Sequence, residues 1–267
     1  MIAVLPWIFI LALLYLGVRW FEKANLYFPE KQLYGSPADY GLAYEEVRLP
    51  TADGIQLGAW YVPPAAPGAK VLILSHGNGG NRGYRLPKIA LFKSLGYGVL
   101  SYDYRGYGDS AGSPSEKGTY LDAQAAYDWL SREKKIAPEA IVSFGESLGS
   151  AVALDLAVKR HVAGLILESA FTSTEDVGRV HFPFLPVRLM VSFRYDNRAK
   201  IKSLRAPLLV VHSPSDEIVP FRMGRELFSL AHEPKTFLEI SGTHNDGYQM
   251  SERTYRAGVG KFMETLR

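Results

Sequence analysis

The sequence predicts an α/β fold in which a mainly parallel sheet is covered by helices on both faces. Short apolar stretches alternate with longer helical patterns from residue 71 onward, as expected for strands that are buried on both faces. One such stretch ends in a glycine-flanked serine that leads directly into a helical pattern. With 267 residues and 47% hydrophobic content, the chain is long enough for one large domain of this class.

The composition excludes several classes of protein. A formal net charge of +3, from 30 basic and 27 acidic side chains, is too small to indicate nucleic-acid binding. Because the chain contains no cysteine, it has no disulfide framework, no thiolate nucleophile and no cysteine-based zinc site. A nucleophile must therefore be an oxygen atom, and we expect neither a metal nor a cofactor.

The N-terminal segment is apolar. Residues 2–18 carry no charge, and Arg19 and Trp20 follow at the position of a membrane interface. We therefore expect residues 1–24 to form a single transmembrane anchor that contacts the lipid bilayer through residues 2–21. A cleaved signal and an amphipathic or core-packed helix are the alternatives. The positive charges after the span place the remaining chain in the cytoplasm by the positive-inside rule.

The elements of the catalytic domain, residues 25–267, follow in order. Residues 25–40 form a connection, and residues 44–49 and 55–62 form a hairpin around the Asp53-Gly54 turn. Further strands are predicted at residues 71–74, 98–102, 141–144, 165–167, 208–211 and 236–240. Helices are predicted at residues 86–94, 115–132, 147–159 and 223–230 and towards residue 266. Together they make an eight-stranded type of sheet with an antiparallel edge.

The central motif is the Gly-Glu-Ser-Leu-Gly sequence at residues 145–149. A strand that turns sharply into a helix at such a motif forms a nucleophile elbow, in which Gly145 and Gly149 permit close approach and Ser147 is exposed. The motif alone occurs by chance in many chains. The predicted strand before the motif and the predicted helix after it make Ser147 the candidate nucleophile.

A serine nucleophile needs a base and an acid that orients the base. Asp216 follows the strand at 208–211 and His244 follows the last strand, so both lie at carboxyl ends of strands, where open α/β sheets bind ligands. Ser147, Asp216 and His244 are therefore the candidate triad. Glu217 is the rival acid. None of the other five histidines follows the last strand.

Attack by a serine on a carbonyl group produces a negatively charged oxygen, the oxyanion, which two backbone N–H groups should stabilise. One belongs to the residue after the nucleophile, and the other belongs to a loop that follows an earlier strand. Leu148 supplies the first. Asn78, in the glycine-rich loop after the strand at 71–74, is the candidate for the second. A phosphate-binding loop is the alternative, but the spacing of its glycines does not match. We expect His76 to shape this loop, and the loop at residues 102–110 to be held together by Asp103 and Arg105.

These motifs resemble the membrane-anchored α/β-hydrolase-domain serine hydrolases, a group that includes protein depalmitoylases and bacterial relatives. The resemblance extends over nearly all of residues 25–267, and it rests on the segments at residues 75–78, 102–108, 114–117, 145–149, 167–173, 216–220 and 242–246. It implies an α/β-hydrolase fold, the triad Ser147, Asp216 and His244, and oxyanion donors at Asn78 and Leu148. The depalmitoylases attach through a cysteine-rich segment that this chain lacks.

The region at about residues 174–206 is the candidate for a small cap. Its middle is apolar, and Phe182, Phe184, Leu185 and Met190 would line an acyl-binding pocket; packing of one core helix is the alternative. We therefore expect a serine esterase or thioesterase for short-to-medium acyl or lipid-like substrates. A peptidase of the same fold and a non-catalytic membrane scaffold are the rival functions. The sequence does not indicate an oligomeric state.

Overall fold

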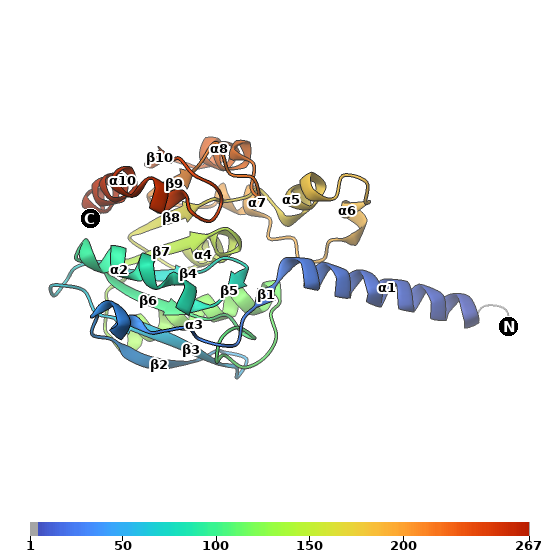
Figure 1. Cartoon of the computed structure of the whole chain (residues 1–267), viewed down its shortest axis with the longest axis horizontal. Coiled ribbons are helices and arrows are strands. Elements are labelled where there is room, and N and C mark those ends of the chain that lie inside the picture. The colour runs from blue at the N-terminus through green and yellow to red at the C-terminus, as the bar shows by residue number, and fades with distance from the viewer. Residues whose placement is uncertain (1–4, 267) are drawn as a thin grey trace.

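A single eight-stranded sheet forms the centre of the computed structural model, which describes residues 5–266 (Figure 1). The strand order is β10-β9-β8-β7-β4-β6-β3-β2. The strands are β2 (Glu45–Pro50), β3 (Gln56–Val62), β4 (Val71–Ser75), β6 (Gly98–Tyr102), β7 (Ile141–Glu146), β8 (Gly164–Glu168), β9 (Leu208–His212) and β10 (Lys235–Glu239). Two short strands, β1 (Phe28–Pro29) and β5 (Gly79–Gly80), pair separately.

The six strands from β10 to β6 pair in parallel, and β3 and β2 complete the sheet with antiparallel pairing. The predicted parallel sheet with an antiparallel hairpin at its edge is thus confirmed. Since parallel strands share one direction, the loops that follow β4, β7, β9 and β10 all leave the same edge of the sheet. The candidate catalytic residues lie in these loops.

Helices cover both faces of the sheet, as predicted. Along β4, Val71 and Ile73 face one hydrophobic core, and Leu72 and Leu74 face the other, because side chains alternate along a strand. The first core is covered by α3 (Glu116–Arg132), α4 (Leu148–Lys159) and α8 (Phe221–Leu230), and the second by α2 (Leu86–Ser94) and α10 (Glu252–Thr265). The shorter helices are η1 (Pro37–Tyr40), η2 (Arg82–Arg85), η3 (Pro138–Ala140), α5 (Thr174–His181), α6 (Val187–Met190), α7 (Asn197–Ile201) and α9 (Gly247–Met250).

The N-terminal helix α1 (Leu5–Leu26) differs from the predicted transmembrane anchor. Within residues 5–266, no helix combines the length and the apolar character needed to cross a membrane. The apolar stretch ends at Arg19, and the last two turns of α1 also carry Glu22 and Lys23. Residues 2–4 of the expected span lie outside the described residues. The predicted membrane localisation and bilayer contact, which depended on this span, therefore lose their support.

The C-terminal half of α1 is attached to the predicted cap, while its N-terminal half extends away from the body (Figure 1). Arg19 donates a hydrogen bond to the carbonyl oxygen of Met190. The Glu22 carboxylate accepts hydrogen bonds from the backbone N–H of Ser192 at 2.6 Å and of Phe193 at 2.8 Å. These contacts make the end of α1 part of the structure around the cap, which contains the helices α5 and α6.

Candidate active site

Ser147 lies in a sharp turn between β7 and α4. Its backbone angles, φ 52° and ψ −118°, are strained for a residue with a side chain, and this conformation exposes the hydroxyl group. The flanking glycines allow the turn to form. A Cβ atom on Gly145 would lie 2.1 Å from the carbonyl oxygen of Gly149, and one on Gly149 would lie 2.0 Å from that of Ser75.

The structure brings the three predicted triad side chains together from loops far apart in the sequence. His244 Nε2 lies 3.0 Å from Ser147 Oγ, and His244 Nδ1 lies 2.9 Å from both carboxylate oxygens of Asp216. Asp216 follows β9 and His244 follows β10. A carboxylate at Nδ1 fixes the proton on that nitrogen, so Nε2 is left to accept the hydroxyl proton of Ser147.

Asp216 is held in the ionised state. Burial of its carboxylate favours protonation, but hydrogen bonds from His212 and His244 outweigh this effect and hold the pKa of Asp216 below its ordinary value. The backbone N–H groups of Ile218 and Val219 also donate to Oδ1, at 3.0 and 2.7 Å. His212, which the sequence analysis left without a role, thus helps to position the acid.

Glu217, the rival acid, has a different place in the site. Its carboxylate accepts a hydrogen bond from the backbone N–H of His244 at 3.0 Å, whereas the imidazole ring of His244 bonds to Asp216. Glu217 can therefore hold the loop that carries His244. It cannot orient the ring through this contact.

The two predicted oxyanion residues, Asn78 and Leu148, line the same pocket as Ser147. Leu148 is the first residue of α4, where helical N–H groups have no partner within the helix. The carbonyl oxygen of Asn78 accepts hydrogen bonds from the N–H of Phe28 at 3.0 Å and from the Tyr107 hydroxyl at 2.8 Å. These bonds fix the orientation of the loop beside the serine.

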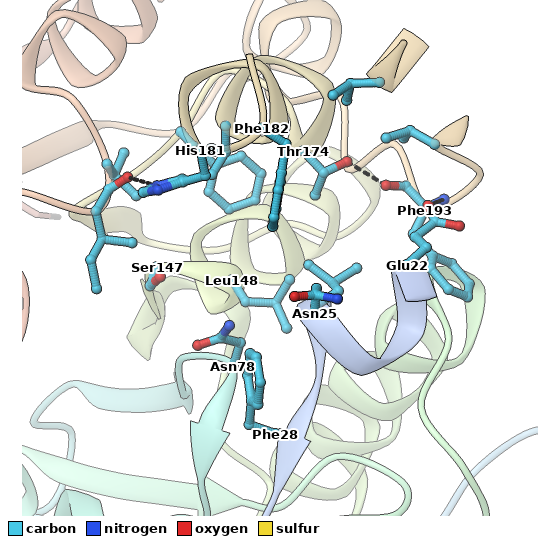
Figure 2. A pocket seen from close by; sticks show the side chains of 18 of the residues that line it. Glu22, Asn25, Phe28, Asn78, Ser147, Leu148, Thr174, His181, Phe182 and Phe193 are labelled. Carbon is cyan, nitrogen blue, oxygen red and sulfur yellow. Dashed lines mark hydrogen bonds between the residues drawn. The ribbon is translucent and has the colours of Figure 1, made fainter. Parts of the chain in front are cut away.

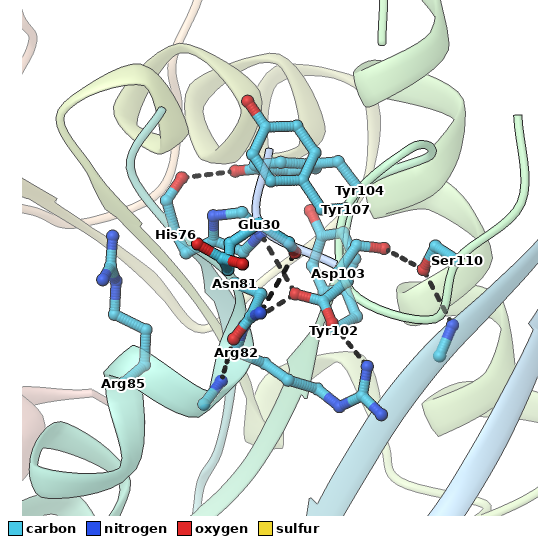
Figure 3. Close-up of polar contacts among 12 residues, drawn as sticks. Glu30, His76, Asn81, Arg82, Arg85, Tyr102, Asp103, Tyr104, Tyr107 and Ser110 are labelled. Atoms are coloured by element: carbon cyan, nitrogen blue, oxygen red, sulfur yellow. Dashed lines mark hydrogen bonds and ion pairs between the residues drawn. The ribbon is translucent and has the colours of Figure 1, made fainter. Parts of the chain in front are cut away.

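The loop that carries Asn78 rests on a buried polar cluster (Figure 3). His76 is fully buried, contacts the Tyr104 ring at a centroid distance of 4.3 Å, and has its pKa lowered by burial to about 3, so the ring is neutral. Below it, Asp103 accepts hydrogen bonds from the backbone N–H of Arg82 at 2.6 Å and from the guanidinium of Arg82. His76 and Asp103 therefore have the structural roles expected of them. Arg105 bonds instead to the carboxylates of Asp53 and Asp122.

An apolar cavity of about 530 Å³ opens beside Ser147 (Figure 2). Three of the four predicted acyl-contacting residues, Phe182, Leu185 and Met190, line it. Phe184 does not line the cavity, because the turn between α5 and α6 directs its side chain into solvent, where it is 98% exposed. That assignment was wrong.

The sequence analysis missed the wall formed by the N-terminal segment. Phe21, Glu22, Asn25 and Leu26 from α1 line the cavity, together with Phe28 from β1. In Figure 2, Phe28 approaches the cavity from the side opposite to Phe182. The sequence analysis assigned Phe21 and Glu22 to a membrane anchor, and Asn25, Leu26 and Phe28 to a connecting segment.

A second cavity, of about 460 Å³, also adjoins the nucleophile, and its lining is more polar than that of the first cavity. It shares Phe28, Asn78, Ser147, His244 and Asn245 with the apolar cavity. Its remaining lining includes the charged and polar side chains of Arg85, Lys88, Glu146, Tyr248 and Gln249. Ser147 is thus placed at the junction of an apolar and a polar chamber.

A buried ion cluster underlies the polar chamber. Lys88 bonds to the carboxylates of Glu146 and of Glu168, the latter at 2.8 Å. Burial opposes the charge of Lys88, but these two carboxylates raise its pKa above the ordinary value. The sequence offered only a weak signal, a lysine within an apolar helix. Within residues 5–266, no group of His, Asp and Glu side chains is arranged to hold a metal ion.

Comparisons with known proteins agree with the fold. Residues 70–185 match the family model described as the α/β hydrolase fold. The chain is 39% identical to the uncharacterized protein Rv2307c of Mycobacterium tuberculosis, over 97% of this chain and 94% of that protein. It is 35% identical to the lysophosphatidylserine lipase ABHD12 of Macaca fascicularis, over 68% of this chain and 50% of that protein. Among solved structures, an esterase of Pyrococcus furiosus, Pf2001, aligns with a TM-score of 0.76 at 21% identity, over 90% of this chain and 99% of that one.

Proposed function

Because the chain belongs to the α/β hydrolase family and is a hydrolase, we propose that it cleaves carboxylic esters or thioesters through Ser147, His244 and Asp216. One observation carries this proposal: the unbroken series of contacts from Ser147 Oγ to His244 Nε2, at 3.0 Å, and from His244 Nδ1 to Asp216, at 2.9 Å. Such a series is what a serine hydroxyl requires to become a nucleophile.

In the proposed reaction, His244 Nε2 accepts the hydroxyl proton while Ser147 Oγ attacks the carbonyl carbon of the substrate. The tetrahedral intermediate collapses when protonated His244 gives this proton to the leaving alcohol or thiol, and an acyl-enzyme remains. Water then attacks the carbonyl carbon of the acyl group with His244 again as the base, the bond to Ser147 Oγ breaks, and His244 returns the proton to that oxygen as the carboxylic acid leaves. The ionised Asp216 stabilises the imidazolium that forms in both steps.

The developing oxyanion would be bound by the backbone N–H groups of Leu148 and Asn78. The N–H of Leu148 has the required freedom, because the first turn of α4 provides it no partner. The next peptide group is held through the Asn78 carbonyl oxygen by Phe28 and Tyr107, and the peptide group that carries the Asn78 N–H is held through the Gly77 carbonyl oxygen, 2.7 Å from His76 Nδ1. Donors that are fixed before the charge develops need no reorganisation during the reaction.

The two chambers differ in polarity, as do the acyl group and the leaving group of an ester substrate. The apolar chamber, with Phe182, Leu185 and Met190, is suited to the acyl group, and the polar chamber, with Arg85 and Gln249, is suited to the leaving group. We therefore propose an ester with one acyl chain and a polar alcohol or thiol part. The relative ABHD12 is named as a lipase for lysophosphatidylserine, a lipid of this general form.

Ser147→Ala tests the proposal. With p-nitrophenyl butyrate and the matching S-aryl thiobutyrate as substrates, kcat should fall by a factor on the order of 10⁶, since the attacking oxygen is lost. Labelling by a fluorophosphonate probe should also disappear. Ser229→Ala, a change of an exposed serine on α8, is the matched control and should keep both properties. Hydrolysis by the Ser147→Ala variant above a few per cent, or no labelling of the wild type, would refute the proposed nucleophile.

A further inference from the structure

A second apolar cavity lies outside the apolar chamber, between α1 and the cap. It has a volume of about 590 Å³. One side consists of α1 residues at helical spacing from Ile10 to Phe21, and the other consists of Leu185 and Met190. Every side chain that lines this cavity is apolar. We call it the distal groove.

The distal groove adjoins the apolar chamber. Phe21, Leu185 and Met190 line both cavities, so the two meet at these three side chains. The α1 helix is held against the cap at this junction by the bonds of Arg19 to Met190 and of Glu22 to Ser192. The Phe21 and Phe182 rings also pack edge to face, at a centroid distance of 5.7 Å. The junction is therefore built by specific contacts that fix α1 beside the chamber.

We propose that the distal groove is a subsite for the end of a long acyl chain whose ester carbonyl lies at Ser147. This inference rests on the proposed ester hydrolysis and names its substrate class, long-chain monoacyl esters. The occupant follows from the three side chains that the two cavities share and from the apolar lining, which provides no partner for a charged or hydrogen-bonding group. An acyl chain attached at Ser147 would fill the chamber first and then pass Phe21.

The dimensions agree with such a chain. From Ile10 to Phe21 the helix rises about 16 Å. An extended alkyl chain of roughly 13 or 14 carbons has this length, since each C–C bond of about 1.5 Å advances a zigzag chain by about 1.3 Å. We expect a butyryl group, which has only four carbons, to end within the apolar chamber. A palmitoyl group is long enough to enter the groove, and each methylene that leaves water there should improve kcat/KM by up to roughly fourfold.

Gly17 offers a direct way to obstruct the groove. It lines the groove, and a Cβ atom added there would meet no other atom within 4 Å. The indole of Gly17→Trp can therefore occupy the groove without displacing the backbone. Ala12→Trp is the matched control, because it adds the same side chain to an exposed position of α1 that does not line the groove.

The measurement is the ratio of kcat/KM for p-nitrophenyl palmitate to kcat/KM for p-nitrophenyl butyrate, with both esters in the same detergent micelles. In Gly17→Trp this ratio should fall by about tenfold or more, because the end of the palmitoyl chain loses its apolar contacts in the groove. In Ala12→Trp it should stay within about twofold of the wild-type ratio. Circular dichroism and the melting temperature establish that each variant is folded. If Gly17→Trp does not fold, Leu14→Trp provides a second obstruction, since Leu14 also lines the groove and is 60% exposed.

The outcomes separate the two proposals. An unchanged ratio in a folded obstructing variant would overturn the distal subsite and leave ester hydrolysis intact. An equal fall in Ala12→Trp would also overturn it, because the effect would then come from the surface of α1 and not from the groove. Absence of hydrolysis of either ester by the wild type would refute the proposed function and the subsite with it.

Discussion

Replacement of Lys88 by methionine is expected to destabilise the protein strongly. The Lys88 side chain is 2% exposed and lies between the carboxylates of Glu146 and Glu168, which are 18% and 5% exposed. Methionine fills a similar volume, but it removes the positive charge and leaves two buried carboxylates. Arg85, 3.3 Å from Glu146, is the neighbouring cation that remains at this carboxylate.

The magnitude follows from the burial of the group. Removing one partner of a buried ion pair costs about 3–5 kcal/mol, because the remaining charge is neither hydrated nor paired. For a chain of this size, this loss corresponds to a melting temperature lowered by about 6–20 °C. Lys117→Met, on the exposed surface of α3, is the matched control, and it should change the unfolding free energy by less than about 0.5 kcal/mol.

Lys88→Met should also reverse the direction in which the unfolding free energy changes with pH. In the wild type, burial favours the protonated form of Glu146, but Arg85 and Lys88 hold its pKa below the ordinary value. Glu146 therefore contributes stability above the pKa of an unfolded glutamate, about 4.3, which is lost as the pH falls. Without Lys88, burial of the Glu146 carboxylate favours uptake of a proton by the folded state. The unfolding free energy of Lys88→Met should then rise as the pH falls from about 7 to about 5.

Urea denaturation at several pH values in this range measures both effects. A loss below about 1 kcal/mol at pH 7 would show that the carboxylates are hydrated or paired without Lys88. A destabilisation that grows as the pH falls would contradict the expected sign of the pH dependence. Either result would refute the interpretation of the cluster as a buried, mutually neutralised group.

Three further substitution pairs test the site and the fold. Asp216→Asn should lower kcat on p-nitrophenyl butyrate on the order of 10⁴-fold, because the productive tautomer of His244 is lost. Glu217→Gln should change kcat only a few-fold. A larger loss in Glu217→Gln than in Asp216→Asn would identify Glu217 as the acid. Phe182→Ala should raise KM for p-nitrophenyl octanoate about tenfold, since an apolar wall is removed, while Phe184→Ala should leave KM unchanged because that side chain is 98% exposed. Gly149→Ala should destabilise the protein by about 3 kcal/mol or more, because the added Cβ would clash with the Ser75 carbonyl oxygen. Gly260→Ala, whose added Cβ meets nothing within 4 Å, should stabilise α10 by about 0.5–1 kcal/mol. Equal melting temperatures for the two variants would contradict the close approach of the backbones at Gly149.

The sequence by itself was sufficient for the sheet and for the identity of the candidate triad. Buried parallel strands require continuous apolar runs, and these runs are visible without coordinates. The loops that carry Ser147, Asp216 and His244 follow strands that point in one direction, so their convergence could be inferred from chain order alone. The sharp turn at Ser147 was also predictable, because glycines on both sides of it permit a close approach of the strand and the helix.

Only the tertiary structure decided what surrounds the nucleophile. An apolar helix shows the same residue pattern whether lipid or a protein cavity faces it, so the sequence did not assign Phe21 and Leu26 to the wall of the chamber. The direction of a side chain in an irregular segment depends on backbone angles set by distant contacts, and for this reason Phe182 and Phe184 could not be distinguished. The partners of Lys88 lie 58 and 80 positions away, and only the packing of α2 against the ends of β7 and β8 brings these charges together.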